Sequence, residues 1–281
     1  MSIGYYAAQN YQYPLDMVSS CAMAYSIRQL SKSWSTRIMT IRRASDNATT
    51  DLSFDTNGKI SNSSPVSAGG TLGTWGSTTN CFIQTWYDQS GHTNDVTQAT
   101  LAAQPQLTSS GTVLTPGPLF VLSPTVTFLT ITALTQGTLN LPFTSFYASE
   151  INTSTLGNYT VSDSNNTTRY TLRYANSGSA ENPLIGAITG TTVLSANTFY
   201  LISGFNASSG TTGSIYVNGI FDSSTTAANT TALNGVSLGR ITPTSGQFSG
   251  YISEVITYNS TLSTTQFQAL NANMKNFYGI P

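Results

Sequence analysis

The side chains best suited to chemistry gather in one short stretch, Asn80–Gln98, which reads NCFIQTWYDQSGHTNDVTQ. Aromatic and β-branched residues alternate with polar ones in its first half, and this pattern predicts a strand. Turn-forming residues follow, including an aspartate that can bond its own backbone and a glycine that can adopt positive φ. The stretch therefore predicts a buried strand that ends in a polar corner. The corner carries the side chains of Asp88, Gln89, Asn94 and Asp95.

The polar corner has two interpretations. Its side chains can satisfy the buried backbone of a turn, which is the interpretation we favour, or they can bind a sugar or a cation. A calcium ion held by Asp88, Asn94 and Asp95 is the one cofactor that these oxygens suggest. The single histidine, His92, cannot anchor a histidine-based metal site and is expected in a solvated loop.

Charged residues make up only 7% of the chain, against a usual share of about 25%. The formal net charge is −1, which gives no electrostatic reason to expect nucleic acid or an anionic membrane as a partner. The N-terminus shows no basic segment followed by an apolar one, so we expect no secretory signal and no membrane insertion. Cys21 and Cys81 are too few for a disulfide scaffold and are expected to be free, buried thiols.

Strand patterns recur every 10 to 15 residues along most of the chain, which favours a β-sandwich. Apolar spacing predicts a helix over Leu15–Leu30, with Asp16 as its N-cap. An Asn-Gly pair inside Gly213–Asp222 predicts a β-hairpin. Near the C-terminus, Phe248–Tyr258 reads as a last strand, and Leu262-Ser263 caps a helix with one apolar face.

Aromatic residues outside these patterns suggest binding surfaces. Residues 1–14 form an expected N-terminal arm for assembly, and residues 15–281 an expected single β-sandwich domain. Trp34 and Trp75 could stack on sugar rings, or they could belong to the core. The tyrosines of the arm are Tyr5, Tyr6, Tyr11 and Tyr13.

The run WYDQSGHTNDVTQ, with RRASDNATTDLSFDTNG before it, resembles the catalytic domain of fungal family 54 α-L-arabinofuranosidases. It is equally similar to the laminin-G-like, concanavalin A-type jelly rolls of phage and giant-virus structural proteins. The resemblance runs from about Ala22 to Leu107, and it returns at the Tyr-Val-Asn-Gly hairpin and the last strand and helix. It implies an all-β fold, a concanavalin A-like jelly-roll sandwich with a short N-terminal helix and a C-terminal helix.

The resemblance also implies where catalytic carboxyls would lie. In the arabinofuranosidase family a nucleophilic glutamate follows a vicinal cysteine pair, and an acid/base aspartate lies in a glycine-rich turn after a late strand. The corresponding segment here, Tyr159–Asn166, has neither cysteine nor glutamate, and only Asp163 is near. The late turn Leu238–Thr242 contains Arg240 and no aspartate. Because a retaining glycosidase needs two carboxyls about 5 Å apart, the sequence predicts the fold without the catalytic pair.

Glu254 could be catalytic, but we expect a structural acid paired with an arginine such as Arg240 or Arg43. The leading hypothesis is therefore a non-catalytic virion structural protein, capsid-associated or part of a tail or fibre. It would be made in the host cytoplasm and bind other capsid proteins or copies of itself. The alternatives are an extracellular carbohydrate-binding module for host attachment and an α-L-arabinofuranosidase-like hydrolase.

Overall fold

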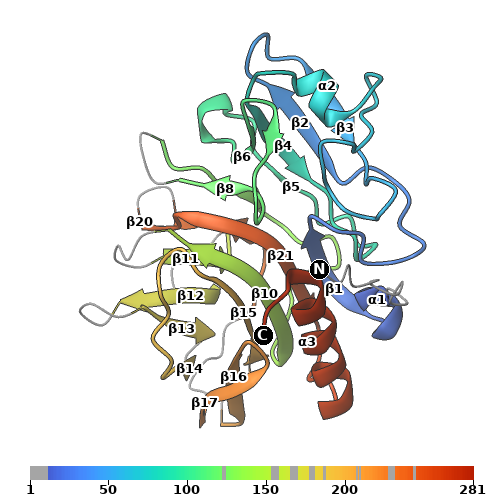
Figure 1. Ribbon diagram of the computed structural model, residues 1–281. Helices are drawn as coiled ribbons and strands as arrows, with labels where there is room; N and C mark the ends of the chain where they lie inside the picture. Colours follow the sequence, from blue (N-terminus) through green and yellow to red (C-terminus); the bar gives the residue numbers. More distant parts are fainter. Residues whose placement is uncertain are drawn as a thin grey trace, which may run out of the picture.

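The structure is a computed structural model that describes residues 12–121, 125–152, 158–164, 170–176, 181–185, 188–206, 208, 210–226, 232–242 and 245–281. Its strands pair in two layers that face each other, and an N-terminal lobe joins both layers at one end (Figure 1). This architecture confirms the predicted all-β jelly-roll sandwich with a short helix at the N-terminal end and a longer one at the C-terminal end.

The front layer is antiparallel and brings the first and last strands of the chain together. In spatial order its strands are β1 (Cys21–Ser26), β21 (Gly250–Tyr258), β10 (Phe143–Ile151), β15 (Phe199–Asn206), β16 (Thr212–Val217) and β17 (Ile220–Thr226).

The back layer is antiparallel too, and its strands are shorter. In spatial order they are β5 (Val96–Thr97), β9 (Leu129–Ile131), β18 (Val236–Leu238), β11 (Asn158–Ser162), β12 (Tyr170–Asn176), β13 (Glu181–Ile185) and β14 (Ile188–Thr189). A separate hairpin of β19 (Arg240–Thr242) and β20 (Ser245–Gln247) follows β18.

The N-terminal lobe is joined to both layers by strand pairing. Strand β4 (Cys81–Trp86) pairs with β5 of the back layer, and β8 (Leu119–Phe120) pairs with the start of β21 in the front layer. The lobe comprises β2 (Met39–Arg43), β3 (Thr49–Leu52), α2 (Leu72–Gly76), β4 (Cys81–Trp86), a 3₁₀ turn (Leu101–Ala103), β6 (Gln106–Ser109), β7 (Thr112–Val113) and β8 (Leu119–Phe120).

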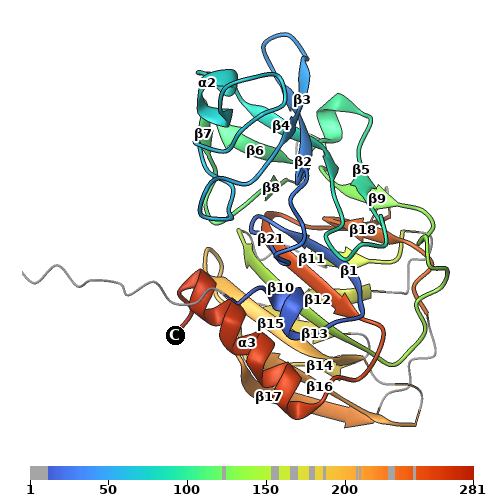
Figure 2. The same cartoon turned by 90° about the vertical axis from the view of Figure 1, so that its right-hand side faces the viewer.

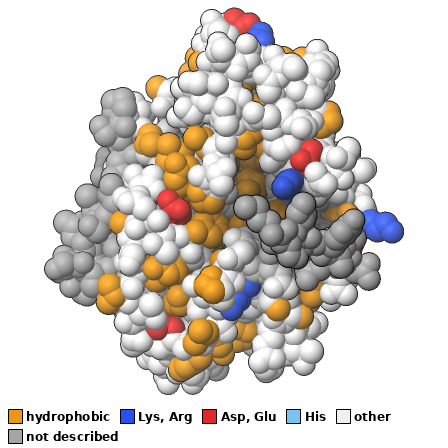
Figure 3. Space-filling view, viewed as in Figure 1, with side chains coloured by type: hydrophobic (Ala, Val, Ile, Leu, Met, Phe, Trp, Pro, Cys, Tyr) orange, Lys and Arg blue, Asp and Glu red, His pale blue; other side chains and the backbone are white. Residues whose placement is uncertain are grey.

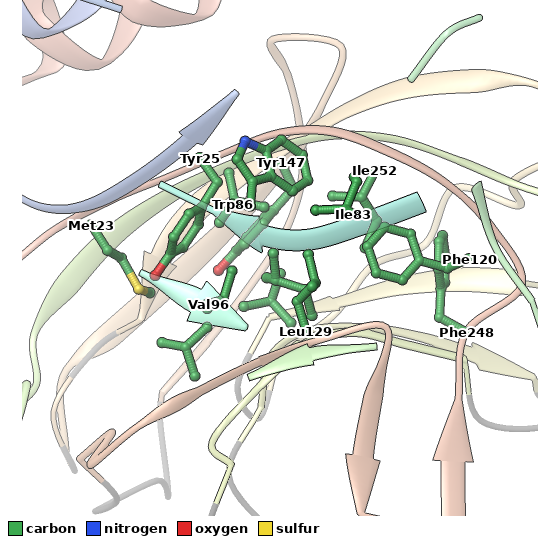
Figure 4. Close-up of a cluster of buried hydrophobic side chains, with 14 of the residues drawn as sticks. Met23, Tyr25, Ile83, Trp86, Val96, Phe120, Leu129, Tyr147, Phe248 and Ile252 are labelled. Atoms are coloured by element: carbon green, nitrogen blue, oxygen red, sulfur yellow. The ribbon is translucent and has the colours of Figure 1, made fainter. Parts of the chain in front are cut away.

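Alternation along β10 shows how the front layer buries both of its faces. Phe143, Tyr147 and Ile151 point into the core between the layers, whereas Phe146 and Ala148 pack toward α3 (Thr264–Tyr278). Figure 2 shows α3 lying along the outer face of this layer. Figure 4 shows the inner core, where Trp86 of β4 lies among side chains from β1, β10 and β21.

The prediction of a helix over Leu15–Leu30 was wrong. Only α1 (Pro14–Met17) is helical, and β1 follows as a strand in which all six residues are buried. Because β1 packs against the core on one side and against the α3 cluster on the other, its apolar residues face both ways. Such a continuous apolar run does not distinguish a buried strand from a helix.

The C-terminal predictions are confirmed. Asn218 and Gly219 have φ of 51° and 76° and form the turn between β16 and β17. Ser263 caps α3 in a reciprocal capping box with Gln266, and Gly279 ends the helix in the left-handed conformation. Within the part of the chain described, no helix is long and apolar enough to cross a membrane.

Candidate functional site

The polar corner after β4 is built around the carboxylate of Asp88, which is fully buried. This carboxylate accepts hydrogen bonds from the backbone N–H groups of Ala24 at 2.7 Å, Ser90 at 2.9 Å and Asn94 at 3.1 Å. The Ser90 hydroxyl donates a fourth bond at 2.7 Å. Burial raises the pKa of the Asp88 carboxyl, and the bonds from Ser90, Ala24 and Asn94 lower it. The carboxylate therefore joins β1 to the turn after β4.

The other corner residues bond the same segments. Gln89 accepts from the backbone N–H of Leu30 and donates to the carbonyls of Ser26 and Arg28. Asn94 donates to the carbonyl of Ala22 and accepts from the backbone N–H of Thr135. Asp95 accepts from the backbone N–H of Asp88 at 2.9 Å.

These contacts decide what the corner can do chemically. Four N–H and O–H groups already face the Asp88 carboxylate, so a cation there would compete with donors for the same lone pairs. No cluster of three or more His, Cys, Asp or Glu side chains lies among the described residues. Calcium binding and sugar binding at this corner stay predictions of the sequence. His92 is exposed.

Replacing Asp88 by alanine should lower the free energy of unfolding by about 3 to 5 kcal/mol, because each buried N–H left without an acceptor costs about 1 to 3 kcal/mol. Urea unfolding followed by tryptophan fluorescence measures the change. His92→Ala, at an exposed position of the same turn, is the matched control and should change stability little. Equal stability of the two variants would show that the corner does not hold β1 in place.

Glu254 lies at the centre of the second polar cluster, on the outer face of the front layer. It forms a two-pronged ion pair with Arg28, with Nε–Oε2 at 2.6 Å and NH2–Oε1 at 2.8 Å, and both side chains are fully buried. The hydroxyls of Ser26 and Tyr278 also donate to Oε2. Glu254 is thus a structural acid, as expected, but its partner is Arg28.

Asp163 and Arg240 lie beside the paired strands β11 and β18. Asp163 is fully buried, and its carboxylate accepts the backbone N–H of Asn234 at 2.9 Å. Arg240 is half-buried, with its guanidinium carbon 3.0 Å from the centre of the Phe128 ring. Burial lowers its pKa to about 10. No ion pair joins Arg240 to a carboxylate in the described ranges.

Glu150, near the end of β10, is a carboxylate that the sequence analysis did not single out. Its backbone is paired in the sheet, but its carboxylate makes no hydrogen bond to the described residues, and the side chain is partly buried. It shares the outer face of the front layer with Phe199, its neighbour on β15. Burial raises the pKa of its carboxyl above the usual range. Such a partnerless, perturbed carboxylate marks a candidate functional position, and only its place in the fold reveals it.

Glu150→Gln should raise the melting temperature slightly at neutral pH, by roughly 1 °C. A raised folded pKa means that the ionised form is penalised in the folded state, and glutamine removes this penalty. The gain should vanish below about pH 4, where the carboxyl is protonated in both states. Calorimetry from pH 3.5 to 7.5 tests the trend. A gain that is independent of pH would contradict this account of Glu150.

The remaining sequence candidates have different surroundings. Trp75 is partly buried against the core, and the Arg43 guanidinium lies 4.7 Å from its ring centre. Trp34 is also partly buried. Of the expected assembly arm, Tyr13 is half-buried and precedes α1. Three tyrosines lie outside the described residues: Tyr5, Tyr6 and Tyr11. Cys21 and Cys81 are free and buried, as predicted.

Comparisons with known proteins agree on one fold. A family model for the catalytic region of α-L-arabinofuranosidase B matches residues 15–123. A glutamate-to-glutamine variant of a glycoside hydrolase family 54 α-L-arabinofuranosidase, soaked with 4-nitrophenyl α-L-arabinofuranoside, matches with a TM-score of 0.68 and 16% identity. The chain shares the fold of these enzymes. The match covers 93% of this chain and 64% of that one.

Two further structures extend the comparison. A family 54 enzyme soaked with a cyclic sulfate inhibitor gives a TM-score of 0.67, and an arabinofuranosidase complexed with arabinofuranosyl-α-1,2-xylobiose gives 0.64. Both are 17% identical to this chain, and each match covers 93% of this chain and 64% of the other. This chain therefore spans less than two thirds of the length of the enzymes it resembles. Among curated proteins, none matches it.

These findings correct the leading sequence hypothesis. The expectation of a non-catalytic virion component was wrong, because the family model and the structural matches point to glycoside hydrolases. The predicted capsid partners and virion location were wrong as well, because both depended on the resemblance to viral jelly rolls. That resemblance misled because it concerned the fold, and a fold does not determine a function.

Proposed function

We propose that this chain is a glycoside hydrolase domain that cleaves α-L-arabinofuranosyl groups from carbohydrate substrates. The observation that carries the proposal is the agreement of two independent comparisons, the family model over residues 15–123 and the fold match over 93% of the chain. An extracellular location, the alternative considered above, is what a polysaccharide substrate requires.

The nucleophile follows by elimination among the glutamates. One matched enzyme was studied as a glutamate-to-glutamine variant soaked with an aryl arabinofuranoside, which directs attention to this residue type. The chain has three glutamates. Glu254 is excluded because its carboxylate is saturated by Arg28, Ser26 and Tyr278. We set Glu150 aside because it lies on the outer face of the front layer, where its neighbour Phe199 packs against Tyr278 of α3. Glu181 remains.

Glu181 begins β13, where its backbone is opposite Asn176 of β12. In the proposed reaction its carboxylate attacks the anomeric carbon, and the bond from that carbon to the leaving oxygen breaks. Water then cleaves the glycosyl ester, which releases arabinose, restores the carboxylate and gives one proton to the departed leaving-group anion or to solvent. Each step conserves charge and needs no cofactor or external oxidant.

The preferred leaving group follows from the sequence around Arg240. The turn in which the family resemblance implies an acid/base aspartate carries no carboxylate here. Without a proton donor, the leaving oxygen must depart as an anion. Aryl arabinofuranosides with a stable phenolate, such as 4-nitrophenolate, are therefore the substrates that this domain should cleave fastest.

Release of 4-nitrophenolate from its α-L-arabinofuranoside tests the proposal. We expect release by the purified chain well above the buffer rate, and none from the matched β-D-xylopyranoside. Release from both substrates at one rate would indicate an unspecific contaminant, and release from neither would overturn the proposed function.

A further inference from the structure

A groove runs between the N-terminal lobe and the C-terminal end of α3, on the outer side of the front layer. Its volume is about 520 Å³, within the range of ligand sites. Figure 3 shows hydrophobic side chains gathered in the hollow below the lobe. The apolar walls come from the lobe on one side and from β15 and α3 on the other. They include Ile60, Val113, Leu114, Phe199, Phe277 and Tyr278.

Two exposed polar side chains border this apolar groove. Lys59 and Asn62 line it, and neither the Lys59 ammonium nor the Asn62 amide NH2 makes a hydrogen bond to any residue described. The Asn62 carbonyl oxygen is engaged, since it accepts the backbone N–H of Val113 at 3.0 Å. The opposite side is aromatic and is formed by Phe199, Phe277 and Tyr278. The groove thus offers hydrogen-bond donors on one side and aromatic rings on the other.

This arrangement fits one class of ligand better than others. A purely apolar ligand would make no use of the donors of Lys59 and Asn62 at the edge of the groove. A neutral sugar chain presents apolar C–H faces, which pack on aromatic rings, and hydroxyls, which both donate and accept. Neutral oligosaccharides therefore match both the walls and the polar edge of the groove.

We propose that this groove binds an unbranched, neutral pentose oligosaccharide at a second carbohydrate site, separate from the catalytic one. The choice of a pentose chain as the ligand rests on the proposed function, whereas the location of the binding site rests on the groove itself. One matched enzyme was complexed with an arabinofuranosyl group on xylobiose, which makes a xylose backbone the natural probe. The front layer separates the groove from β13, the strand on which Glu181 lies.

Titration calorimetry with xylohexaose tests the inference. This sugar carries no arabinofuranosyl group, so its binding does not depend on hydrolysis. Wild-type protein should bind it saturably, with a Kd of about 1 mM or lower. Thr112 is exposed and lines the groove, so Thr112→Trp should fill the groove and weaken binding at least tenfold. Thr226→Trp, at an exposed position on β17, is the matched control and should bind as wild type does.

Asn62→Ala should weaken binding roughly threefold to tenfold, because it removes the donor of one hydrogen bond. Absence of saturable binding, equal binding by Thr112→Trp and wild type, or loss of binding in Thr226→Trp alone would overturn the second site. Hydrolysis of the aryl arabinofuranoside without xylohexaose binding would refute only this inference. Binding without hydrolysis would refute only the proposed function.

Discussion

Replacing Glu181 by glutamine should abolish release of 4-nitrophenolate, with kcat/KM falling by about 10⁴-fold or more, as when nucleophiles of other hydrolases are removed. Glutamine is nearly isosteric with glutamate but cannot attack the anomeric carbon as an anion. The measurement is initial rate against substrate concentration, with circular dichroism to confirm that the variant is folded.

Asp46→Asn provides the matched carboxylate-to-amide control. Asp46 is exposed, lies in the turn between β2 and β3 of the N-terminal lobe, and pairs with Arg43 at 2.7 Å. Its variant should retain the wild-type rate. If Glu181→Gln keeps more than about a tenth of the wild-type activity, a loss of only about 1.4 kcal/mol of transition-state stabilisation, Glu181 is not the nucleophile.

The second large effect concerns stability. Arg28→Met should lower the free energy of unfolding by about 3 to 5 kcal/mol, because it leaves the Glu254 carboxylate buried without its counterion. The Arg28–Glu254 ion pair is fully buried. It joins the segment after β1, the strand β21 and the end of α3. Urea unfolding at pH 7 measures the loss.

The double variant Arg28→Met, Glu254→Leu separates the charge effect from packing. Removing both charges also removes the uncompensated carboxylate, so the double variant should be more stable than Arg28→Met alone. The single variant Glu254→Leu completes the comparison. If the stability losses of Arg28→Met and Glu254→Leu add up to the loss in the double variant, the ion-pair account is contradicted.

The fold was predictable where local chemistry alone determines the structure. The Asn-Gly turn and the Ser263 capping box each depend on a few neighbouring residues, and both are found as predicted. The prediction of a helix over Leu15–Leu30 failed because the burial of both faces of β1 depends on partners more than 200 residues away. These partners are the β21 residues from Tyr258 to Glu254. A single sequence does not display such pairings.

The sites were harder to predict for the same reason. Asp88 was placed in a polar corner from its turn chemistry, but its longest-range bond, to Ala24, is set by the packing of β1. The predicted arginine partners of Glu254 were wrong because Arg28 reaches it only through the pairing of β1 with β21. Glu150 has no motif at all. Its position beside Phe199 emerges only from the strand register.

The central claim is that this sandwich is a hydrolase with Glu181 as its nucleophile. An arabinofuranose-configured cyclic sulfate tests it most directly, because a carboxylate nucleophile opens this electrophile and stays covalently attached. We predict that intact-mass measurement shows one adduct per chain, that fragment sequencing places it on Glu181, and that Glu181→Gln remains unlabelled. An unlabelled wild-type chain, or an adduct on another carboxylate, would contradict the account.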